Sequence, residues 1–227
     1  GYKGPCRIFG GRVVKGAHGK RLGGPLAVDA CGTHLDNSWY SPGLGALTFG
    51  MGGVNDAEDA DVILHEFGHA LQDAICPDFG QSRQAAAMGE GFGDYLAATF
   101  LANKKTAEYR TSVITWGISP HDCSRVSLRR VDEDLTVDDF VDEEDREHAN
   151  GRIWSCTLWD IREAFGWEIA DTLIIESHFQ LDAFTTFDRG ARAILDAARN
   201  LYGRKYRKRL LDIFHKRGLS WDSLKAR

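Results

Sequence analysis

Hydrophobic residues between positions 61 and 75 recur at the spacing of an α-helix. Residues three and four apart lie on the same face of a helix, so this pattern predicts a helix with one apolar side. Pro77 follows where such a helix is expected to end. The apolar positions that define the predicted helix are Val62, Ile63, Phe67, Ala70, Leu71, Ala74 and Ile75.

Residues 85–95 are also largely apolar, and we predict a second, mostly buried helix there. The last third of the chain holds four more apolar stripes at helical spacing, three of which stop at or near a glycine. These stripes are Ile153, Trp154, Leu158, Ile161 and Phe165; Ile169, Leu173, Ile174 and Phe179; Ile194, Leu195, Ala198 and Leu201; and Tyr206, Leu210, Leu211 and Phe214.

The first 53 residues differ in being rich in glycine, with short β-prone runs at residues 7–9, 12–14 and 47–49. The chain therefore combines a β-rich part with a helical part, and we predict an α+β fold. We expect residues 1–76, including the first helix, to form a small β lobe. Residues 77–227 are expected to form a mainly helical lobe.

Composition limits the possible classes of protein. The chain has 227 residues, enough for one domain or two lobes that share a cleft. It is 43% hydrophobic and has no apolar run long enough to cross a bilayer, so no membrane partner is predicted. A net charge of −5 argues against general nucleic-acid binding. The five cysteines lack C-x-x-C spacing, which argues against a cysteine zinc site, and one or two disulfides between them stay possible. They are Cys6, Cys31, Cys76, Cys123 and Cys156.

Candidate chemistry begins inside the first helix, where residues 65–69 form an H-E-x-x-H motif. His65 and His69 are one helical turn apart, so both imidazoles project from one face and are able to bind one Zn²⁺. Glu66 stands beside them, in position to act as a general base on water. The helix is therefore a candidate catalytic metal site.

The second helix supplies a third ligand. A catalytic zinc site uses three protein ligands and one open position. The extended pattern with a third histidine is excluded, because Ile75 stands where that histidine is required. Glu90 lies 21 residues after His69 in an apolar segment, where a carboxylate needs a partner. We predict Glu90 as the third ligand and Asp94 as the acceptor for the second ring N–H of a ligand histidine.

These two helices resemble those of glutamate-type zinc metalloendopeptidases, the thermolysin-like and more closely the fungalysin-like enzymes. The resemblance rests on residues 65–69 and on Met88-Gly89-Glu90-Gly91-Phe92-Gly93-Asp94-Tyr95. It extends over roughly residues 36–219, with further similarity at residues 188–192 and 216–219. It implies a zincin fold in which both lobes form one catalytic domain around a cleft.

The resemblance also implies roles for residues outside the motif. Residues 37–42 and 47–50 resemble the strand pair that precedes the zinc helix, which would bring Asn37 and Ser38 against substrate backbone. His148, before a predicted helix, matches the histidine that donates to the developing oxyanion. Arg129 matches the arginine that bonds the substrate carbonyl. The family's tyrosine donor is missing, since no tyrosine lies between Asp73 and Glu90.

The predicted function is a secreted zinc endopeptidase acting on proteins or peptides. The chain begins at Gly1 without a signal-like segment, so we expect a processed or cut chain, and secretion follows from the resemblance alone. A propeptide or inhibitor outside this chain is a further expected partner. Two alternatives stay open: a zinc-stabilised binding or assembly module, and an aminopeptidase. Retention of Glu66 favours hydrolysis, and no G-x-M-E-N element for anchoring an amino terminus is present.

One acidic segment has two interpretations. Nine acids lie between Asp132 and Asp145. Such a run is typical of a solvated loop. The alternative is a Ca²⁺ site, because calcium prefers several carboxylate and carbonyl oxygens, although the spacing fits no EF-hand.

Overall fold

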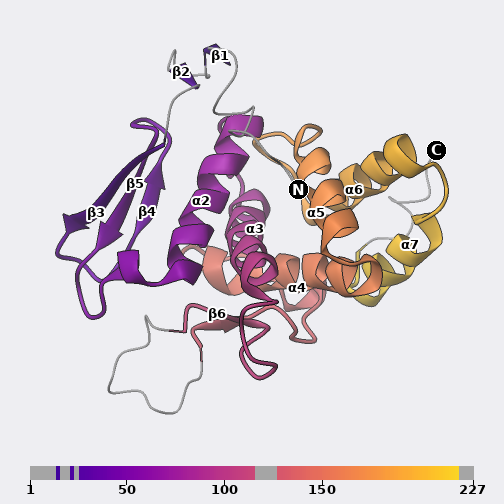
Figure 1. The fold of residues 1–227 in the computed structure, drawn as a ribbon. Helices are drawn as coiled ribbons and strands as arrows, with labels where there is room; N and C mark the ends of the chain where they lie inside the picture. The colour runs from indigo at the N-terminus through magenta and orange to yellow at the C-terminus, as the bar shows by residue number, and fades with distance from the viewer. Residues whose placement is uncertain (1–13, 16–20, 23–25, 116–126, 220–227) are drawn as a thin grey trace.

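The computed structural model describes residues 14–15, 21–22, 26–115 and 127–219 (Figure 1). The predicted run at 7–9 lies outside these residues, as does most of the run at 12–14. Val14 belongs to the short strand β1 (Val14–Lys15), which pairs antiparallel with β2 (Arg21–Leu22).

A three-stranded sheet stands at one side of the molecule, next to the motif helix (Figure 1). Its strands are β3 (Ala27–Thr33), β4 (Trp39–Ser41) and β5 (Ala46–Gly50), in the order β3-β5-β4. The predicted strand pair is confirmed, because β4 runs antiparallel to β5 with Tyr40 opposite Leu47. The side chains of β3 are mostly exposed, and its sequence lacks the alternation that would have predicted a seven-residue strand.

Among the described residues, six long helices build the rest of the fold, and each matches a predicted apolar stripe. Three stripe residues were wrong as core positions. Ile63 is 37% exposed, Phe179 follows the end of its helix and is 60% exposed, and Leu201 is 45% exposed. The helices are α2 (Ala60–Ile75), α3 (Arg83–Leu101), α4 (Glu147–Phe165), α5 (Trp167–His178), α6 (Phe187–Tyr202) and α7 (Arg207–Lys216).

Shorter elements connect these helices. Two-residue strands β6 (Ser112–Val113) and β7 (Arg129–Arg130) pair antiparallel below α3 and α4 in the view of Figure 1. The 3-10 helices η1 (Asp56–Glu58) and η2 (Val137–Asp139) precede α2 and α4.

Two hydrophobic clusters hold the helices and the sheet together. One packs the helices from α3 through α7 together and includes Phe92, Leu158 and Phe214. The other joins the sheet to α2, α3 and α4, with Phe49 and Trp159 among its members. The observed fold is α+β, as predicted. The division at residues 76 and 77 stays a prediction, and the second cluster contains residues from both sides of it.

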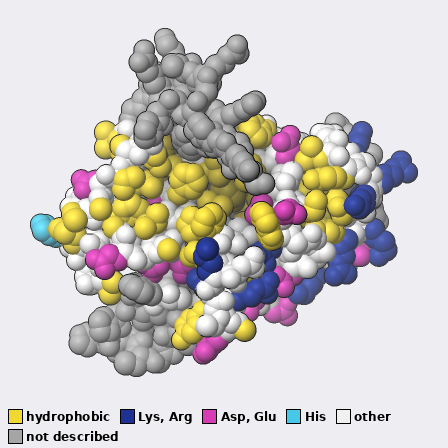
Figure 2. All heavy atoms as spheres, viewed as in Figure 1, with side chains coloured by type: hydrophobic (Ala, Val, Ile, Leu, Met, Phe, Trp, Pro, Cys, Tyr) yellow, Lys and Arg dark blue, Asp and Glu magenta, His cyan; other side chains and the backbone are white. Residues whose placement is uncertain are grey.

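The surface separates by residue type. Figure 2 shows hydrophobic side chains gathered on the sheet side of this face and Lys and Arg gathered at the opposite end, where α6 and α7 lie. The basic run before and within α7 contributes to that end, and the Lys208 side chain is 91% exposed. The basic residues of α7 thus lie on the solvent-facing side of the last helix. Among the described residues, no helix combines the length and the apolar character that a membrane span requires.

Candidate active site

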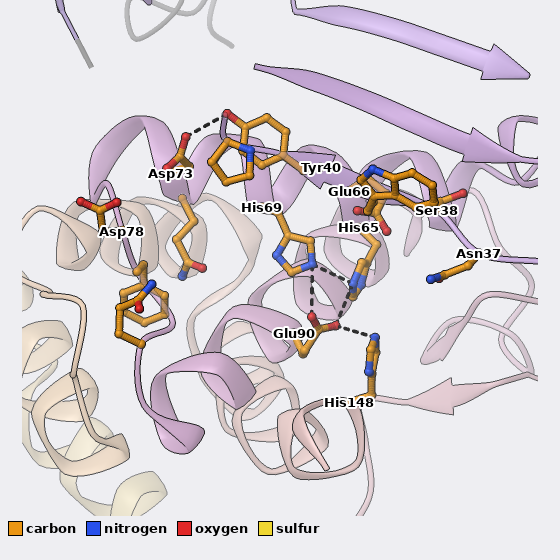
Figure 3. Close-up of a pocket in the computed structure, with 15 residues that line it drawn as sticks. Asn37, Ser38, Tyr40, His65, Glu66, His69, Asp73, Asp78, Glu90 and His148 are labelled. Atoms are coloured by element: carbon orange, nitrogen blue, oxygen red, sulfur yellow. Dashed lines mark hydrogen bonds and ion pairs between the residues drawn. The ribbon is translucent and has the colours of Figure 1, made fainter. Parts of the chain in front are cut away.

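Helix α2 carries His65, Glu66 and His69 into the wall of a cavity (Figure 3). The helix starts where the Asp59 carboxylate accepts a hydrogen bond from the backbone N–H of Asp61 at 2.8 Å, a standard N-cap. The two imidazoles are one turn apart, with ring centroids 4.8 Å apart and the rings edge to face. Glu66 is buried beside them, so the three side chains of the motif lie at one place.

Helix α3 brings Glu90 and Asp94 to opposite sides of the His65 ring. Asp94 Oδ1 lies 2.9 Å from His65 Nδ1, and Glu90 Oε2 lies 3.1 Å from His65 Nε2. A carboxylate only accepts hydrogen bonds, so Nδ1 carries the hydrogen toward Asp94. When the ring is protonated, Nε2 donates to Glu90 in the same way; in the neutral ring with its hydrogen on Nδ1, Nε2 is the atom that can bind a metal ion.

Three of these groups form a triangle that fits a metal ion. His65 Nε2 is 3.2 Å from His69 Nε2, and His69 Nε2 is 3.5 Å from Glu90 Oε1. Tetrahedral zinc with ligands at about 2.0–2.2 Å separates its ligand atoms by roughly 3.4 Å. A metal ion between these three atoms would accept a lone pair from each of them. The donor set His65, His69 and Glu90 therefore fits zinc, and it is the potential metal-binding group of the described residues.

The pKa values of His65, His69 and Glu90 are set by burial and by the charged groups around them. Burial lowers the pKa of His65, but the hydrogen bonds with Asp94 and Glu90 outweigh this and raise it to about 10. Burial lowers the pKa of His69 to about 4. Burial raises the pKa of Glu90, yet the hydrogen bond with His65 and the charges around it bring the value down to about 2. The site thus favours a positive charge next to Glu90, which a divalent cation supplies.

Close approach of three helices depends on glycines. A Cβ atom on Gly93 would lie 2.8 Å from His65 Nδ1, and one on Gly91 would lie 2.4 Å from the carbonyl oxygen of Gly151 in α4. Neither position has room for a larger residue without a shift of the helices. These glycines let α3 pass close to the His65 ring and let α4 pass close to Glu90. The sequence analysis did not predict this role, although Gly91 directly follows Glu90 and Gly93 directly precedes Asp94.

His148 lies in the first turn of α4 and points toward Glu90 (Figure 3). Its Nε2 is 3.1 Å from Glu90 Oε2, and its side chain is 57% exposed. The structure therefore brings His148 together with the triangle, at the open side of the site. It is not part of the three-residue metal group.

The three predicted substrate-binding residues have different surroundings. Arg129 in β7 donates to the Asp94 carboxylate through Nε at 2.6 Å and through Nη2 at 2.7 Å. Ser38 donates its hydroxyl to Asp56 Oδ2 at 2.6 Å. Asn37 is exposed and lines the cavities next to the triangle. The side chains of Arg129 and Ser38 thus have protein partners, and Asn37 faces the cleft.

Two cavities meet at the triangle and share His65, Glu66 and His148 in their walls. The first, of about 530 Å³, extends toward Tyr40 and Asp73. The second, of about 560 Å³, extends toward Arg129. A chain that passed through both would cross directly over Glu66. Burial raises the pKa of Glu66.

Two contacts in the first cavity were missed in the sequence. The Tyr40 hydroxyl donates to Asp73 Oδ2 at 2.9 Å, joining the edge strand to α2. Gln72 contacts the buried His178, with 3.2 Å between their Nε2 atoms. Gln72 and Asp73 are three and four residues after His69, so helical spacing placed them near the site. Nothing local indicated partners 33 and 106 residues away.

The acidic segment after residue 131 forms ion pairs and a helix cap. Asp132 pairs with Arg130 at 2.7 Å, and Asp142 pairs with Arg83 at 2.8 Å. Asp139 accepts from the backbone N–H of Thr136 and closes the capping box of η2. Within the described residues these carboxylates do not come together as a metal site, so the calcium interpretation gains no support.

Cys31, Cys76 and Cys156 are free thiols. Cys6 and Cys123 lie outside the described residues. The disulfides that the sequence left open therefore do not involve the three described cysteines.

Residues 54–168 match the family model described as "Fungalysin metallopeptidase (M36)". The matched range is half of the chain and includes the whole triangle. The chain belongs to this family. The predicted resemblance is thereby confirmed.

Relatives of this fungalysin-family chain are named as extracellular proteases. Extracellular metalloproteinase 1 of Arthroderma otae is 24% identical over 191 residues, covering 71% of this chain and 30% of that protein. Extracellular metalloproteinase 2 of Trichophyton tonsurans is 22% identical over 190 residues, with the same coverage. The chain thus spans about 30% of the length of these relatives.

A solved structure shares the fold. The precursor of protealysin, a metalloproteinase from Serratia proteamaculans, superimposes with a TM-score of 0.74 at 17% sequence identity. The match covers 91% of this chain and 72% of that chain. The predicted thermolysin-like α+β fold is confirmed.

Proposed function

We propose that this fungalysin-family chain is a zinc-dependent endopeptidase. The observation that carries the proposal is the convergence of His65, His69 and Glu90 with the buried carboxylate of Glu66 where two cavities meet. Metal binding alone needs only the first three residues. A fourth, buried carboxylate with a raised pKa is what peptide hydrolysis needs in addition.

The side chains at the site have different tasks in this proposal. His65, His69 and Glu90 would hold the zinc ion, and Asp94 would keep the His65 ring in the tautomer that offers Nε2. Zinc in such a site makes water more acidic and polarises the carbonyl of the bond to be cleaved. Glu66 takes the proton of the attacking water and later passes it to the leaving amine.

His148 is proposed to stabilise the charge that develops on the carbonyl oxygen. Its imidazole is half exposed at the open side of the triangle, with Nε2 3.1 Å from Glu90 Oε2. A donor directed at the place where negative charge appears lowers the barrier more than it strengthens substrate binding.

Substrate backbone is proposed to pair with β4. This strand is one of the two edges of the three-stranded sheet, the one that lies beside α2 (Figure 1). An extended peptide added to its outer edge would pass over Glu66, with Asn37 facing it from the cleft. Secretion is part of the same proposal, because the relatives are named extracellular metalloproteinases.

Digestion of a denatured protein mixture, followed by sequencing of the new termini, tests the proposal. We expect internal cleavage by the zinc-loaded chain, loss of cleavage with a chelator, and recovery when zinc is returned. Glu66→Gln serves as the control that retains the ligands. Release of single residues from amino termini would point to an aminopeptidase, and zinc binding without any cleavage would point to a binding module.

A further inference from the structure

The cavity on the Arg129 side combines apolar walls with charged ends. Val62, Ile114 and Leu128 contribute the apolar part, and His65 and Glu66 form the end at the proposed reaction centre. Its volume of about 560 Å³ is large enough for a long side chain. In the proposed function, a side chain that entered this cavity would belong to a substrate residue next to the bond to be cleaved.

Both arginines that line this cavity are already neutralised by carboxylates. The guanidinium of Arg129 donates two hydrogen bonds to the Asp94 carboxylate. Arg152 donates two to Glu133 in the same way, from Nε to Oε2 at 2.6 Å and from Nη2 to Oε1. Fork-to-carboxylate pairs of this geometry use the directional donors of arginine. Neither arginine is therefore available as the main partner of a substrate carboxylate.

Asp56 in the same wall has no arginine partner among the described residues: burial raises its pKa, and only the hydrogen bonds from Ser38 and the backbone of Gly50 act in the opposite direction. It is only 8% exposed, and Ser38 holds it through the 2.6 Å hydrogen bond to Oδ2. Ser38 is itself fixed, because its Oγ accepts from the backbone N–H of Gly50 at 3.2 Å. Within the part of the chain that the structure describes, no Lys, Arg or His forms an ion pair with Asp56. A nearly buried carboxylate without a cation is an unfavourable arrangement that a positively charged ligand would relieve.

A second carboxylate adds to this negative potential. Asp36 also lines the cavity, and its carboxylate lies against Gly53, where a Cβ would meet both oxygens at 3.2 Å. Asp36 and Asp56 are close enough for their charges to interact. The Lys and Arg side chains visible in Figure 2 gather mainly at the far end, over α6 and α7. With both arginines paired to carboxylates, Asp36 and Asp56 make this end of the cavity negative, and a negative end attracts a positively charged ligand.

We propose that this cavity binds a lysine or arginine side chain of the substrate, with Asp56 as the residue that determines specificity. The inference rests on the proposed function, since it assigns a substrate class to the same site. The aliphatic stem of the basic residue packs on Val62, Ile114 and Leu128, and its charged head reaches Asp56 and Asp36. Long basic side chains commonly bury their stems in this way while the head meets a polar group.

Matched peptides test the proposal. A series differs only at one residue beside the cleaved bond, which is lysine, arginine, norleucine or glutamate. We expect kcat/KM for the lysine and arginine peptides to exceed that for norleucine by about tenfold, as a charge-assisted contact implies. The preference should shrink as salt increases. Equal rates for lysine and norleucine would overturn the proposal.

Variants locate the preference. Asp56→Asn should bring the ratio of lysine to norleucine kcat/KM toward one, and Asp36→Asn should lower it less because that residue is exposed. Asp134→Asn is the matched control: it removes one negative charge at a side chain that is 89% exposed and outside the cavity, so the ratio should persist. A ratio unchanged in folded Asp56→Asn, verified by thermal melting, would overturn the assignment.

Binding separates this inference from the proposed function. Fluorescence anisotropy with the Glu66→Gln variant measures the affinity for each peptide without hydrolysis. Tighter binding of the lysine peptide, lost in Glu66→Gln/Asp56→Asn, supports the inference even if the parent chain cleaves nothing, in which case the proposed function alone fails. Equal affinity for lysine and norleucine peptides overturns the inference even if both are cleaved.

Discussion

Arg129 donates hydrogen bonds to both carboxylate oxygens of Asp94, from Nε at 2.6 Å and from Nη2 at 2.7 Å. The same Asp94 carboxylate also accepts a hydrogen bond from the His65 ring. The Arg129 side chain is only 9% exposed. The arginine that the resemblance assigned to substrate thus contacts the group that orients a proposed zinc ligand. Asp94 joins two functions, orientation of His65 and neutralisation of a nearly buried cation.

Asp94→Ala should therefore weaken zinc binding and destabilise the fold. Loss of the acceptor for His65 is expected to lower zinc affinity about 10–100-fold. The unpaired Arg129 should reduce the free energy of unfolding by about 3–5 kcal/mol. Zinc competition titration measures the first effect, and urea unfolding in the presence of chelator measures the second. In Asp94→Ala/Arg129→Met we expect stability to recover in part while zinc affinity stays low; a single variant as stable as the parent chain would contradict this explanation.

The triangle predicts one zinc ion per chain. X-ray absorption spectroscopy should find nitrogen and oxygen ligands at about 2.0–2.2 Å. Glu90→Ala should lose most of the bound zinc, because it removes the carboxylate that faces both imidazoles. Glu147→Ala is a suitable control, since Glu147 is a neighbouring carboxylate that contacts only the exposed side of His148. Full zinc occupancy in Glu90→Ala would exclude Glu90 as a ligand.

Glu66→Gln should keep the zinc ion and lose hydrolysis. An amide does not accept the proton of the attacking water, and general-base catalysis typically contributes about 10²–10⁴ in rate. Casein hydrolysis and zinc content measured on the same sample check both expectations. In the parent chain, burial raises the pKa of Glu66. The base is active only when ionised, so kcat/KM should fall as the pH decreases through that raised pKa.

His148→Ala should lower kcat by about 10²–10³, or roughly 3–4 kcal/mol, with little change in KM. The proposed hydrogen bond strengthens only as charge develops on the carbonyl oxygen, so its loss affects the transition state. Steady-state kinetics with a peptide substrate give the two constants. Zinc occupancy should stay unchanged; a marked drop would instead identify His148 as a ligand, and near-normal kcat would assign the oxyanion contact to another group.

Gly93→Ala should disturb the site without removing any functional side chain. The added Cβ would lie 2.8 Å from His65 Nδ1, so the ring or α3 must move and the bond to Asp94 must lengthen. We expect weaker zinc binding in a competition titration and a lower melting temperature. Gly43→Ala, where a Cβ meets nothing within 4 Å, is the control. Equal zinc affinity in the two variants would show that the close approach is not required.

Local periodicity was enough to predict most elements and part of the site. The apolar stripes predicted the long helices, because burial of a helix face imposes a spacing that is visible in any short window. The same spacing brought His65, Glu66 and His69 to one helical turn, and their residue types indicated zinc before any fold was known. The edge strand and its partner were also predicted correctly, with Tyr40 opposite Leu47.

Only the tertiary structure decided which distant groups share the site. Arg129 reaches Asp94 across 35 residues, and Ser38 reaches Asp56 across 18, distances that no helical or strand period connects. The close passage of α3 at Gly93 depends on how three helices pack, which the glycine alone does not reveal. The sequence by itself thus determined the chemistry of the motif helix, because that chemistry is local. The partners, charges and cavities around it arose from packing between elements, because their geometry exists only when the whole chain is folded.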